Sequence, residues 1–240
     1  MKQIIVTGDS RGLGLSIVKS ILSQKKYGVI GISRGTNEAI SELLEQDDNY
    51  THLEFDLEQS NKIPHLYKDE IKKVGPIFGL VNNAAFGYDD IVTNARYVSL
   101  NKAFQINVIS PILLSKYAIR DMLLNNCEGS LIHISSITTL TGYKGLAMYA
   151  STKGALESFS KGVAREWGVK GIRSNVVAPG FMETTMTSTL TEDQKNRIYN
   201  RTSLKKPTNE QSVTSAVIFL LSDEAKSITG AIIRVDNGTV

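Results

Sequence analysis

Short, continuous apolar runs alternate along the chain with longer segments whose apolar residues recur at helical spacing. The runs are rich in Ile and Val and do not alternate with polar residues, which is typical of strands covered on both faces of a parallel sheet. The expected strands are Gln3–Thr7, Val29–Ser33, His52–Asp56, Ile77–Val81, Ser130–Ser135, Arg173–Ala178 and Ile232–Val235. The expected helices are Gly12–Gln24, Asn37–Gln46, Leu57–Val74, Lys102–Asn125, Tyr149–Gly168 and Glu210–Leu221. This order predicts an α/β fold with a doubly wound, mostly parallel, seven-stranded sheet and helices on both faces.

One segment, Gly180–Pro207, breaks the alternation, because it is polar, rich in threonine and follows directly on an expected strand. Loops at the carboxyl ends of strands in open α/β sheets are where ligands bind. We therefore interpret the segment as a substrate loop, with an ordinary surface insertion as the alternative. No repeat, low-complexity tract or linker divides the chain, so residues 1–240 are expected to form a single domain.

Composition narrows the class of function. Hydrophobic residues make up 41% of the chain and charged residues 21%, as in a globular protein with a sizeable core. A net charge of +3 with scattered cations favours neither a nucleic-acid partner nor a membrane surface. Cys127 is the only cysteine and the first residues do not resemble a signal peptide, so we expect a cytoplasmic protein. His52, His65 and His133 lack metal-ligand spacing, and no metal site is expected.

The pair Tyr149 and Lys153 is the first candidate for chemistry. The two residues are four apart, so on a helix they share one face. A phenol has a pKa of about 10, and a neighbouring ammonium lowers it by favouring the phenolate. Tyr149 would then transfer a proton and Lys153 would tune it. A half-buried tyrosine beside an exposed lysine is the alternative for this pair on its own.

Two further patterns accompany the pair. The segment Thr7–Gly14 reads Thr-Gly-x-x-x-Gly-x-Gly, follows the first expected strand and opens the first helix. Glycines at these places let the backbone approach a phosphate, whose charge the helix N-terminus stabilises. Ser136 ends the fifth expected strand, thirteen residues before Tyr149. Together the three patterns resemble the short-chain dehydrogenase/reductase family, from Gln3 to Gly238.

The resemblance implies a Rossmann fold and a nicotinamide dinucleotide site. The residues that it places at the cofactor are Gly8, Ser10, Arg11, Gly12, Leu13, Gly14, Asp56, Leu57, Asn83, Ala84, Tyr149, Lys153, Pro179, Gly180, Met182 and Thr184. Asp56 would lie beside the adenine amino group, while the backbone of Met182 and the hydroxyl of Thr184 would hold the nicotinamide carboxamide. Ala85 stands where the family pattern has glycine, which adds a methyl group where backbone runs close to the cofactor.

Two arginines indicate which dinucleotide binds. An acid at the end of the second strand commonly binds the ribose 2′-hydroxyl of NAD and repels a 2′-phosphate. Here Arg34 follows the second expected strand, and no acid occurs before Glu38. Arg34 and Arg11 could both bind a phosphate, and in the family basic residues at either position accompany a preference for NADP. We therefore expect NADPH; a solvated surface charge is the alternative for either arginine alone.

The resemblance also implies four catalytic residues. Ser136 would bond the substrate carbonyl, Tyr149 would donate the proton, Lys153 would hold the nicotinamide ribose and lower the tyrosine pKa, and Asn107 would anchor a water of the proton relay with Lys153. An asparagine within an apolar helical stretch costs free energy unless its amide is satisfied, which supports a specific role for Asn107; a packing role is the alternative.

The substrate is expected to be a small-molecule ketone or acyl thioester. The segment Val177–Thr184 and the tail Ile228–Gly238 look most like 3-oxoacyl-acyl-carrier-protein reductases of fatty acid biosynthesis. Lys170 matches one basic residue that such enzymes offer to an acyl carrier protein, but Glu128 stands where the other is expected. A sugar, steroid-like or secondary-metabolite ketone therefore stays open, as does, more remotely, a non-catalytic NADP(H) sensor.

The resemblance finally implies a homotetramer, paired through the helices around Lys102–Asn125 and Tyr149–Gly168. The apolar residues expected to supply that surface are Ile109, Ile112, Leu113, Tyr117, Leu156, Phe159 and Val163.

Overall fold

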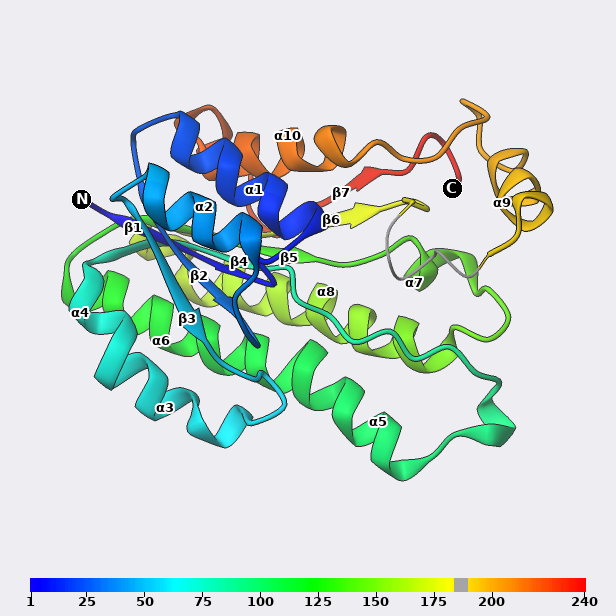
Figure 1. The fold of residues 1–240 in the computed structure, drawn as a ribbon, viewed down its shortest axis with the longest axis horizontal. Helices are drawn as coiled ribbons and strands as arrows, with labels where there is room; N and C mark the ends of the chain where they lie inside the picture. Colours follow the sequence, from blue (N-terminus) through cyan, green and yellow to red (C-terminus); the bar gives the residue numbers. More distant parts are fainter. Residues whose placement is uncertain (184–189) are drawn as a thin grey trace.

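The structure, a computed structural model, describes residues 1–183 and 190–240 and is built on a seven-stranded sheet (Figure 1). The strands lie in the order β3-β2-β1-β4-β5-β6-β7, and every neighbouring pair is parallel. They are β1 (Gln3–Thr7), β2 (Gly28–Ser33), β3 (Tyr50–Glu54), β4 (Ile77–Asn82), β5 (Gly129–Ile134), β6 (Ile172–Pro179) and β7 (Ile232–Val235). The order reverses between β1 and β4, so a ligand crevice is expected beside the carboxyl ends of these strands. The predicted doubly wound fold is confirmed.

Helices cover both faces of the sheet (Figure 1). One face carries α1 (Gly12–Ser23), α2 (Glu38–Gln46) and α10 (Glu210–Leu221). The other carries α3 (Ile63–Leu66), α4 (Lys72–Val74), α5 (Tyr97–Phe104), α6 (Ser110–Leu124) and α8 (Ala147–Trp167). Two shorter helices, α7 (Thr138–Thr141) and α9 (Glu192–Tyr199), lie beyond the carboxyl ends of the strands. The second of these falls inside the segment that was expected to be a loop.

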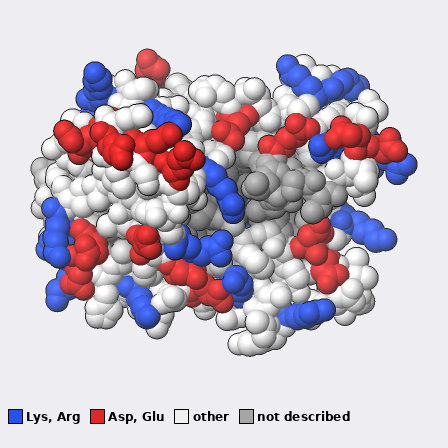
Figure 2. Space-filling view, viewed as in Figure 1, with Lys and Arg blue, Asp and Glu red and all other residues white. Residues whose placement is uncertain are grey.

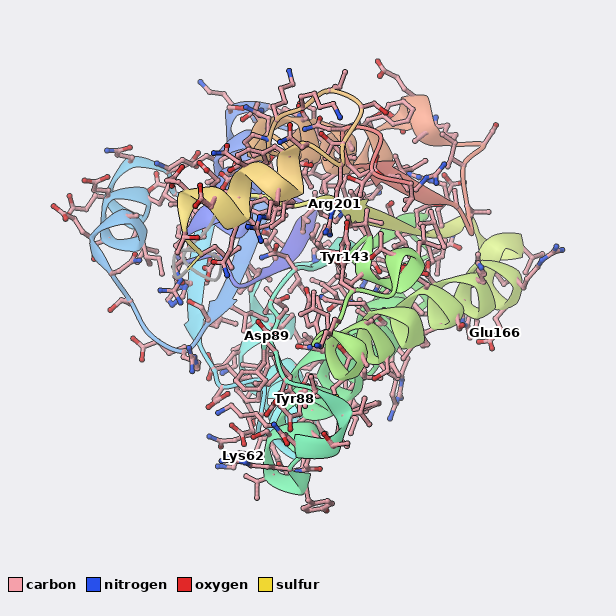
Figure 3. All side chains as sticks on the ribbon, turned by 90° about the vertical axis from the view of Figure 1, so that its right-hand side faces the viewer. Lys62, Tyr88, Asp89, Tyr143, Glu166 and Arg201 are labelled. Atoms are coloured by element: carbon pink, nitrogen blue, oxygen red, sulfur yellow. The ribbon has the colours of Figure 1, made fainter. Side chains whose placement is uncertain are left out.

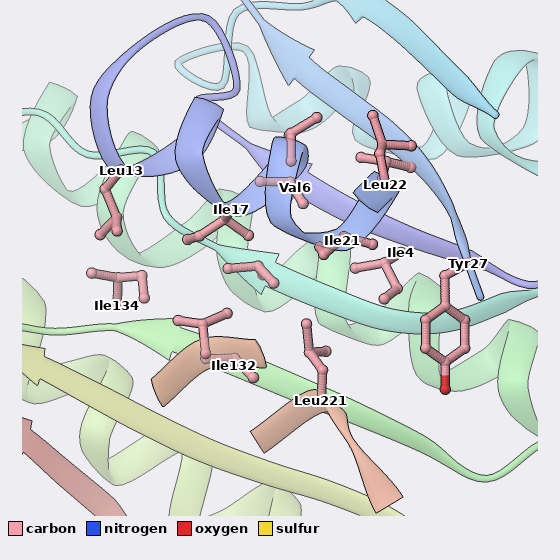
Figure 4. Packing of buried hydrophobic residues seen from close by; sticks show 14 of the residues in the cluster. Ile4, Val6, Leu13, Ile17, Ile21, Leu22, Tyr27, Ile132, Ile134 and Leu221 are labelled. Atoms are coloured by element: carbon pink, nitrogen blue, oxygen red, sulfur yellow. The ribbon is translucent and has the colours of Figure 1, made fainter. Parts of the chain in front are cut away.

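The core between the sheet and the first helical layer fixes β1 under the glycine-rich turn (Figure 4). Ile17 and Ile21 of α1 pack on Ile4 of β1 and Ile132 of β5, and all four side chains are at most 1% exposed. Burying a side chain of this size stabilises the fold by about 1.5–3 kcal/mol. The start of α1, and with it the turn before the helix, is therefore held rigidly against the strand ends.

Three expected elements differ from the structure. The third strand is Tyr50–Glu54 instead of His52–Asp56, because its pairing with β2 begins at Tyr50 opposite Val29. The expected helix over 57–74 divides into a 3₁₀ turn, α3, a π-helical turn and α4. The expected helix over 102–125 starts earlier, at Tyr97, and the π-helical turn Gln105–Ile109 separates α5 from α6. The last break precedes Pro111, which has no backbone N–H to continue the helical bonding.

Part of the surface expected to pair subunits lies in the core. Leu156 and Val163 of α8 are 1% and 4% exposed, and Val163 packs in the core beneath the sheet, so these two side chains offer little surface to a second subunit. Ile109, in contrast, is 36% exposed. Tyr97 and Val98 at the start of α5 are 82% and 76% exposed, and Leu124 at the end of α6 is 77% exposed.

The outer surface carries a mixture of charges (Figure 2). In this view a row of carboxylates crosses one side, and lysines and arginines are scattered around the rest of the outline. None of the helices that the structure describes has the length and apolarity needed to cross a membrane. Within residues 1–183 and 190–240, no three His, Cys, Asp or Glu side chains gather as a metal-binding group.

Candidate active site at the carboxyl edge of the sheet

The expected site residues come from segments that follow the strands, so they meet at the carboxyl edge of the sheet, the side viewed in Figure 3. Asp89, Tyr143 and Arg201 lie at this edge on three different loops (Figure 3). Two of the loops are joined, because the backbone N–H of Asp90 donates to the carbonyl of Gly145 over 2.9 Å. The edge is therefore lined by chain segments far apart in the sequence.

Tyr149 and Lys153 lie on one face of α8, as expected from their spacing. The ammonium of Lys153 lies 5.6 Å from the centroid of the Tyr149 ring and donates to the carbonyl of Ile134 over 2.8 Å. The Lys153 side chain is 1% exposed, and this burial lowers its pKa to about 8. An ammonium has three hydrogens to donate, so a group with hydroxyl acceptors, such as a ribose, fits beside it.

The expectation that Lys153 lowers the pKa of Tyr149 is not met in the structure. Burial raises the pKa of Tyr149 to about 12, because removing a phenolate from water costs more than removing a phenol. The ammonium at 5.6 Å from the ring centroid does not offset that cost. At neutral pH the side chain is therefore a phenol, which suits it to donate a proton.

Ser136 follows β5 directly and begins the turn into α7. Its hydroxyl oxygen accepts from the backbone N–H of Thr138 over 3.3 Å, and the residue is partly exposed. The neighbouring hydroxyl of Ser135 is buried and donates to Glu157 over 2.6 Å. Of the two serines that follow the strand, Ser136 is thus the one that is partly exposed, while Ser135 is buried.

Asn107 lies in the π-helical turn between α5 and α6 and is fully buried. Its amide oxygen accepts from the backbone N–H of Phe86 over 2.7 Å. Its amide nitrogen donates to the Phe86 carbonyl over 2.9 Å and to the Thr152 hydroxyl over 3.0 Å. The side chain ties the segment after β4 to α8, so both of its amide groups already have protein partners.

The glycine-rich turn has the properties that a pyrophosphate requires. Gly8 and Gly12 have φ of +74° and +51°, which L side chains rarely adopt. A Cβ on Gly14 would lie 1.9 Å from the Gly8 carbonyl oxygen, so glycine is needed for α1 to start this close to the turn. Within the described residues, α1 has no side-chain cap and no acid in its first turn, whereas Asn37 caps α2 and Asn209 caps α10. The N–H groups at the start of α1 are thus suited to an anion.

Asn83 and Ala84 anchor the glycine-rich turn through hydrogen bonds to Thr7, the residue before it. Both of their backbone N–H groups donate to the hydroxyl of Thr7 over 3.0 Å, and the amide of Asn83 donates to the Thr7 carbonyl over 2.9 Å. From the sequence, Thr7 had no role beyond its place in the glycine-rich motif. In the structure, the Thr7 hydroxyl joins β1 to the segment after β4. Ser10 lies in the same turn, where its carbonyl accepts from the Asn37 side chain over 2.7 Å, and Leu13 lies at the start of α1.

Arg11 and Arg34 are both exposed and lie on loops that touch each other. The bond from Asn37 to the Ser10 carbonyl joins the loop after β2, which carries Arg34, to the turn that carries Arg11. Asp56 lies outside β3, contrary to expectation, and one of its carboxylate oxygens accepts from the N–H of Glu58 over 2.9 Å. Leu57 is buried at 6% exposure, so it contributes mainly packing.

The segment that follows β6 forms a further part of the carboxyl edge of the sheet. Pro179 is buried, and its carbonyl accepts from the N–H of Ile137, next to Ser136, over 3.1 Å. A Cβ on Gly180 would lie 2.5 Å from the Thr208 hydroxyl, which explains a glycine there. Met182 packs against the core, and Thr184 lies outside the described residues.

Sequence reasoning missed a buried polar cluster beneath the glycine-rich turn. One carboxylate oxygen of Asp9 accepts from the Tyr50 hydroxyl over 2.6 Å and lies 2.8 Å from Nδ1 of His52. Asp9 is fully buried, and a Cβ on Gly31 would lie 1.8 Å from the same oxygen. The signal in the sequence was an acid within the glycine motif, but its partners could not be read from spacing, because they come from another strand.

Comparisons with known proteins agree with this geometry. Residues 8–240 match the family model described as enoyl-(acyl carrier protein) reductase. The chain is 36% identical to a 3-oxoacyl-(acyl-carrier-protein) reductase of Salmonella typhimurium, over 99% of this chain and 96% of that protein. It is 35% identical to carbonyl reductase family member 4 of Xenopus laevis, over 99% of this chain and 97% of that protein. Among solved structures it is similar to a 4-hydroxyisoleucine dehydrogenase complexed with NADH, with a TM-score of 0.94, 25% identity and coverage of 100% and 99%.

Proposed function

The chain belongs to the short-chain dehydrogenase/reductase family, whose members act on CH–OH and C=O groups, and we propose that this one is an NADPH-dependent reductase of 3-oxoacyl thioesters. The observation that carries the proposal is the partly buried phenol of Tyr149, with its pKa raised to about 12 and the Lys153 ammonium 5.6 Å from its ring centroid. A group that is protonated at neutral pH is suited to donate its proton to an alkoxide as a ketone is reduced.

The remaining residues take the following roles in this proposal. When bound, the nicotinamide cofactor supplies the hydride. Ser136 bonds the substrate oxygen and Tyr149 gives it the proton. Lys153 binds the nicotinamide ribose, and its positive charge favours release of the tyrosine proton as the alkoxide forms. The backbone of Asn107 holds water for the relay that returns the proton.

The preference for NADPH rests on the two arginines. Arg34 and Arg11 lie on loops joined by the Asn37–Ser10 bond, so their side chains can reach one phosphate. No carboxylate follows β2 before Glu38 to take a ribose 2′-hydroxyl. One solved structure with a similar fold was crystallised with NADH and another with NADP, so the family fold itself accepts either dinucleotide.

The substrate class rests on the likeness to 3-oxoacyl-(acyl-carrier-protein) reductases over almost the whole chain. Docking of a carrier protein has weaker support, because Glu128 lies against Gly171 and so beside Lys170: a Cβ on Gly171 would be 2.6 Å from Cγ of Glu128. The acid offsets the cation that an acidic carrier would meet. A coenzyme-linked 3-oxoacyl group, which needs no carrier, is therefore the best first substrate.

The test is oxidation of NADPH by the purified protein with acetoacetyl coenzyme A. Crotonyl coenzyme A, a keto sugar, a steroid ketone and a 4-oxo amino acid serve as parallel substrates. Turnover of the acetoacetyl thioester above the others is expected. Turnover of another ketone alone would replace the substrate class, turnover of crotonyl coenzyme A would indicate reduction of a C=C bond, and binding of NADPH with no turnover would favour a sensor.

We also propose that the protein is a cytoplasmic homotetramer that serves fatty acid biosynthesis. Tyr97, Val98 and Ile109, on α5 and the turn that follows it, provide apolar surface that a second subunit would cover. Sedimentation velocity at micromolar concentration is expected to give the mass of four chains, and a stable monomer would contradict the proposal.

A further inference from the structure

The turn that carries Ser136 is held to α8 by one carboxylate. Oε1 of Glu157 accepts from the Ser135 hydroxyl over 2.6 Å and from the Thr139 hydroxyl over 2.9 Å. The Thr139 hydroxyl also lies 3.0 Å from the carbonyl oxygen of Ser136 itself. The residues on both sides of Ser136 are thereby bonded to a single oxygen atom of the helix.

Glu157 lies on the same side of α8 as the catalytic candidates Tyr149 and Lys153, four residues after Lys153 and eight after Tyr149. Lys153 bonds the carbonyl of Ile134, the residue before Ser135. The helix that carries Tyr149 therefore also bonds the end of β5 at Ile134, the next residue Ser135, and Thr139 of α7. The separation between the Ser136 hydroxyl and the Tyr149 phenol depends on these bonds.

The carboxylate of Glu157 interacts with the Ser136 turn through hydrogen bonds. Among residues 1–183 and 190–240 it forms no salt bridge, and its carboxylate is partly buried. Hydroxyl bonds to an ionised acceptor are shorter and stronger than neutral ones, and the 2.6 Å separation from Ser135 falls in that range. A buried carboxylate without a cation beside it is costly unless such donors satisfy it.

We propose that Glu157 is a positioning residue that sets the place of the Ser136 hydroxyl relative to Tyr149, an inference that rests on the proposed reductase function of this site. Glu157 touches neither substrate nor cofactor in this assignment; it acts through Ser135 and Thr139. Its loss should let the Ser136 turn move while the cofactor turn, on the far side of β4, stays in place.

The first test compares Glu157→Ala and Glu157→Gln with a matched control, Glu166→Ala. Glu166 is an exposed acid further along the same helix (Figure 3). Small misplacements in an active site can cost about 100-fold in rate, so we expect Glu157→Ala to lower kcat about 10- to 100-fold. The affinity for NADPH, measured by its fluorescence, should stay within about twofold. Glu157→Gln, whose amide oxygen can accept both hydroxyls, should restore most of the rate, and Glu166→Ala should match the wild type.

A second readout does not depend on turnover. In hydrogen exchange with mass spectrometry, peptides over residues 135–142 should exchange faster in Glu157→Ala than in the wild type and Glu157→Gln, while peptides over residues 4–14 should not change. Unchanged exchange at 135–142 would overturn the proposal, as would an alanine variant with wild-type kcat. If the exchange at 135–142 differed between the variants as expected but the wild type reduced no ketone, the reductase function would be refuted instead. The failure of the positioning role and the failure of the reductase function can therefore be told apart.

Discussion

The catalytic corner, residues 134–139 with Tyr149, Lys153 and Glu157, differs from the α9 region, residues 190–207, in how each is held. The corner is tied by bonds between distant segments, such as Lys153 to Ile134 and Ser135 to Glu157. In contrast, α9 has no buried residue, and many of its bonds are local, including the capping box between Thr191 and Gln194. Bonds from Tyr199 to Glu183 and from Ser203 to Gly238 attach the region to the rest of the molecule.

The difference indicates how reaction and selectivity divide between the two regions. A proton donor must be held within a fraction of an ångström of its acceptor, which requires a rigid surrounding. A segment that closes over varied substrates benefits from few and local contacts. We therefore expect changes in the corner to act on kcat and changes around α9 to act on KM, with smaller effects.

The largest effect is expected from Tyr149→Phe, which removes the proton-bearing oxygen and keeps the ring. Loss of an acid/base group costs about 10²- to 10⁴-fold in rate, so kcat should fall by that factor while NADPH binding is nearly unchanged. Tyr97→Phe is the control, because that phenol is 82% exposed on α5. A Tyr149→Phe variant that keeps more than about a tenth of the wild-type kcat would remove Tyr149 from its role.

The second effect concerns pH and the ammonium of Lys153. With its pKa lowered to about 8 by burial, Lys153 is charged at pH 7 and loses its proton as the pH rises through 8. Because the charged form binds the ribose and favours release of the tyrosine proton, kcat/KM for NADPH should fall about tenfold per pH unit above that point. In Lys153→Arg the fall should move beyond the measurable range, since a guanidinium stays charged. The same fall in both proteins would assign it to another group.

The third effect concerns the choice of cofactor. A charge-assisted bond to phosphate contributes about 1.5–3 kcal/mol, or about 10- to 150-fold in affinity, and a carboxylate adds repulsion. Arg34→Asp should therefore invert the preference from NADPH to NADH in kcat/KM. Lys73→Asp, an equal change of charge at an exposed position in α4, is the control. Equal kcat/KM for both cofactors in the wild type would contradict the assignment of Arg34.

The sequence predicted the doubly wound, seven-stranded sheet because continuous apolar runs between helical segments have few other solutions. It also predicted that Tyr149 and Lys153 share one face of a helix, as they do on α8; that the Ser136 hydroxyl faces them stays a prediction. It could not predict the raised pKa of Tyr149, which depends on burial by residues distant in the chain. The bonds of Glu157 and the Asp9–Tyr50 pair were missed for the same reason.

Sequence patterns also failed to predict two helical features, the π-helical turn before α6 and helix α9. The helix expected over 102–125 contains a π-helical turn, because Pro111 interrupts the bonding and Asn107 is drawn towards Phe86. α9 was missed, although Thr191 and Gln194 have the spacing of a capping box. Its residues are almost all polar, so the apolar periodicity that indicates a helix is absent.

The smallest effect is expected in the α9 region, from Tyr199→Phe. The Tyr199 hydroxyl donates to Glu183 over 2.6 Å, and its ring lies 5.9 Å from that of Phe181, so the residue fastens α9 to the segment after β6. The bond is exposed, and an ordinary hydrogen bond contributes about 0.5–1.5 kcal/mol, which corresponds to a 2- to 12-fold change. We expect the KM for the ketone to rise within that range with little change in kcat, since the ring contact and the catalytic corner are intact. Steady-state kinetics on the substrate that gives the highest turnover measures this. If kcat fell about 100-fold, as expected for a catalytic group, α9 would belong to the rigid part of the site, and the division between the two regions would be wrong.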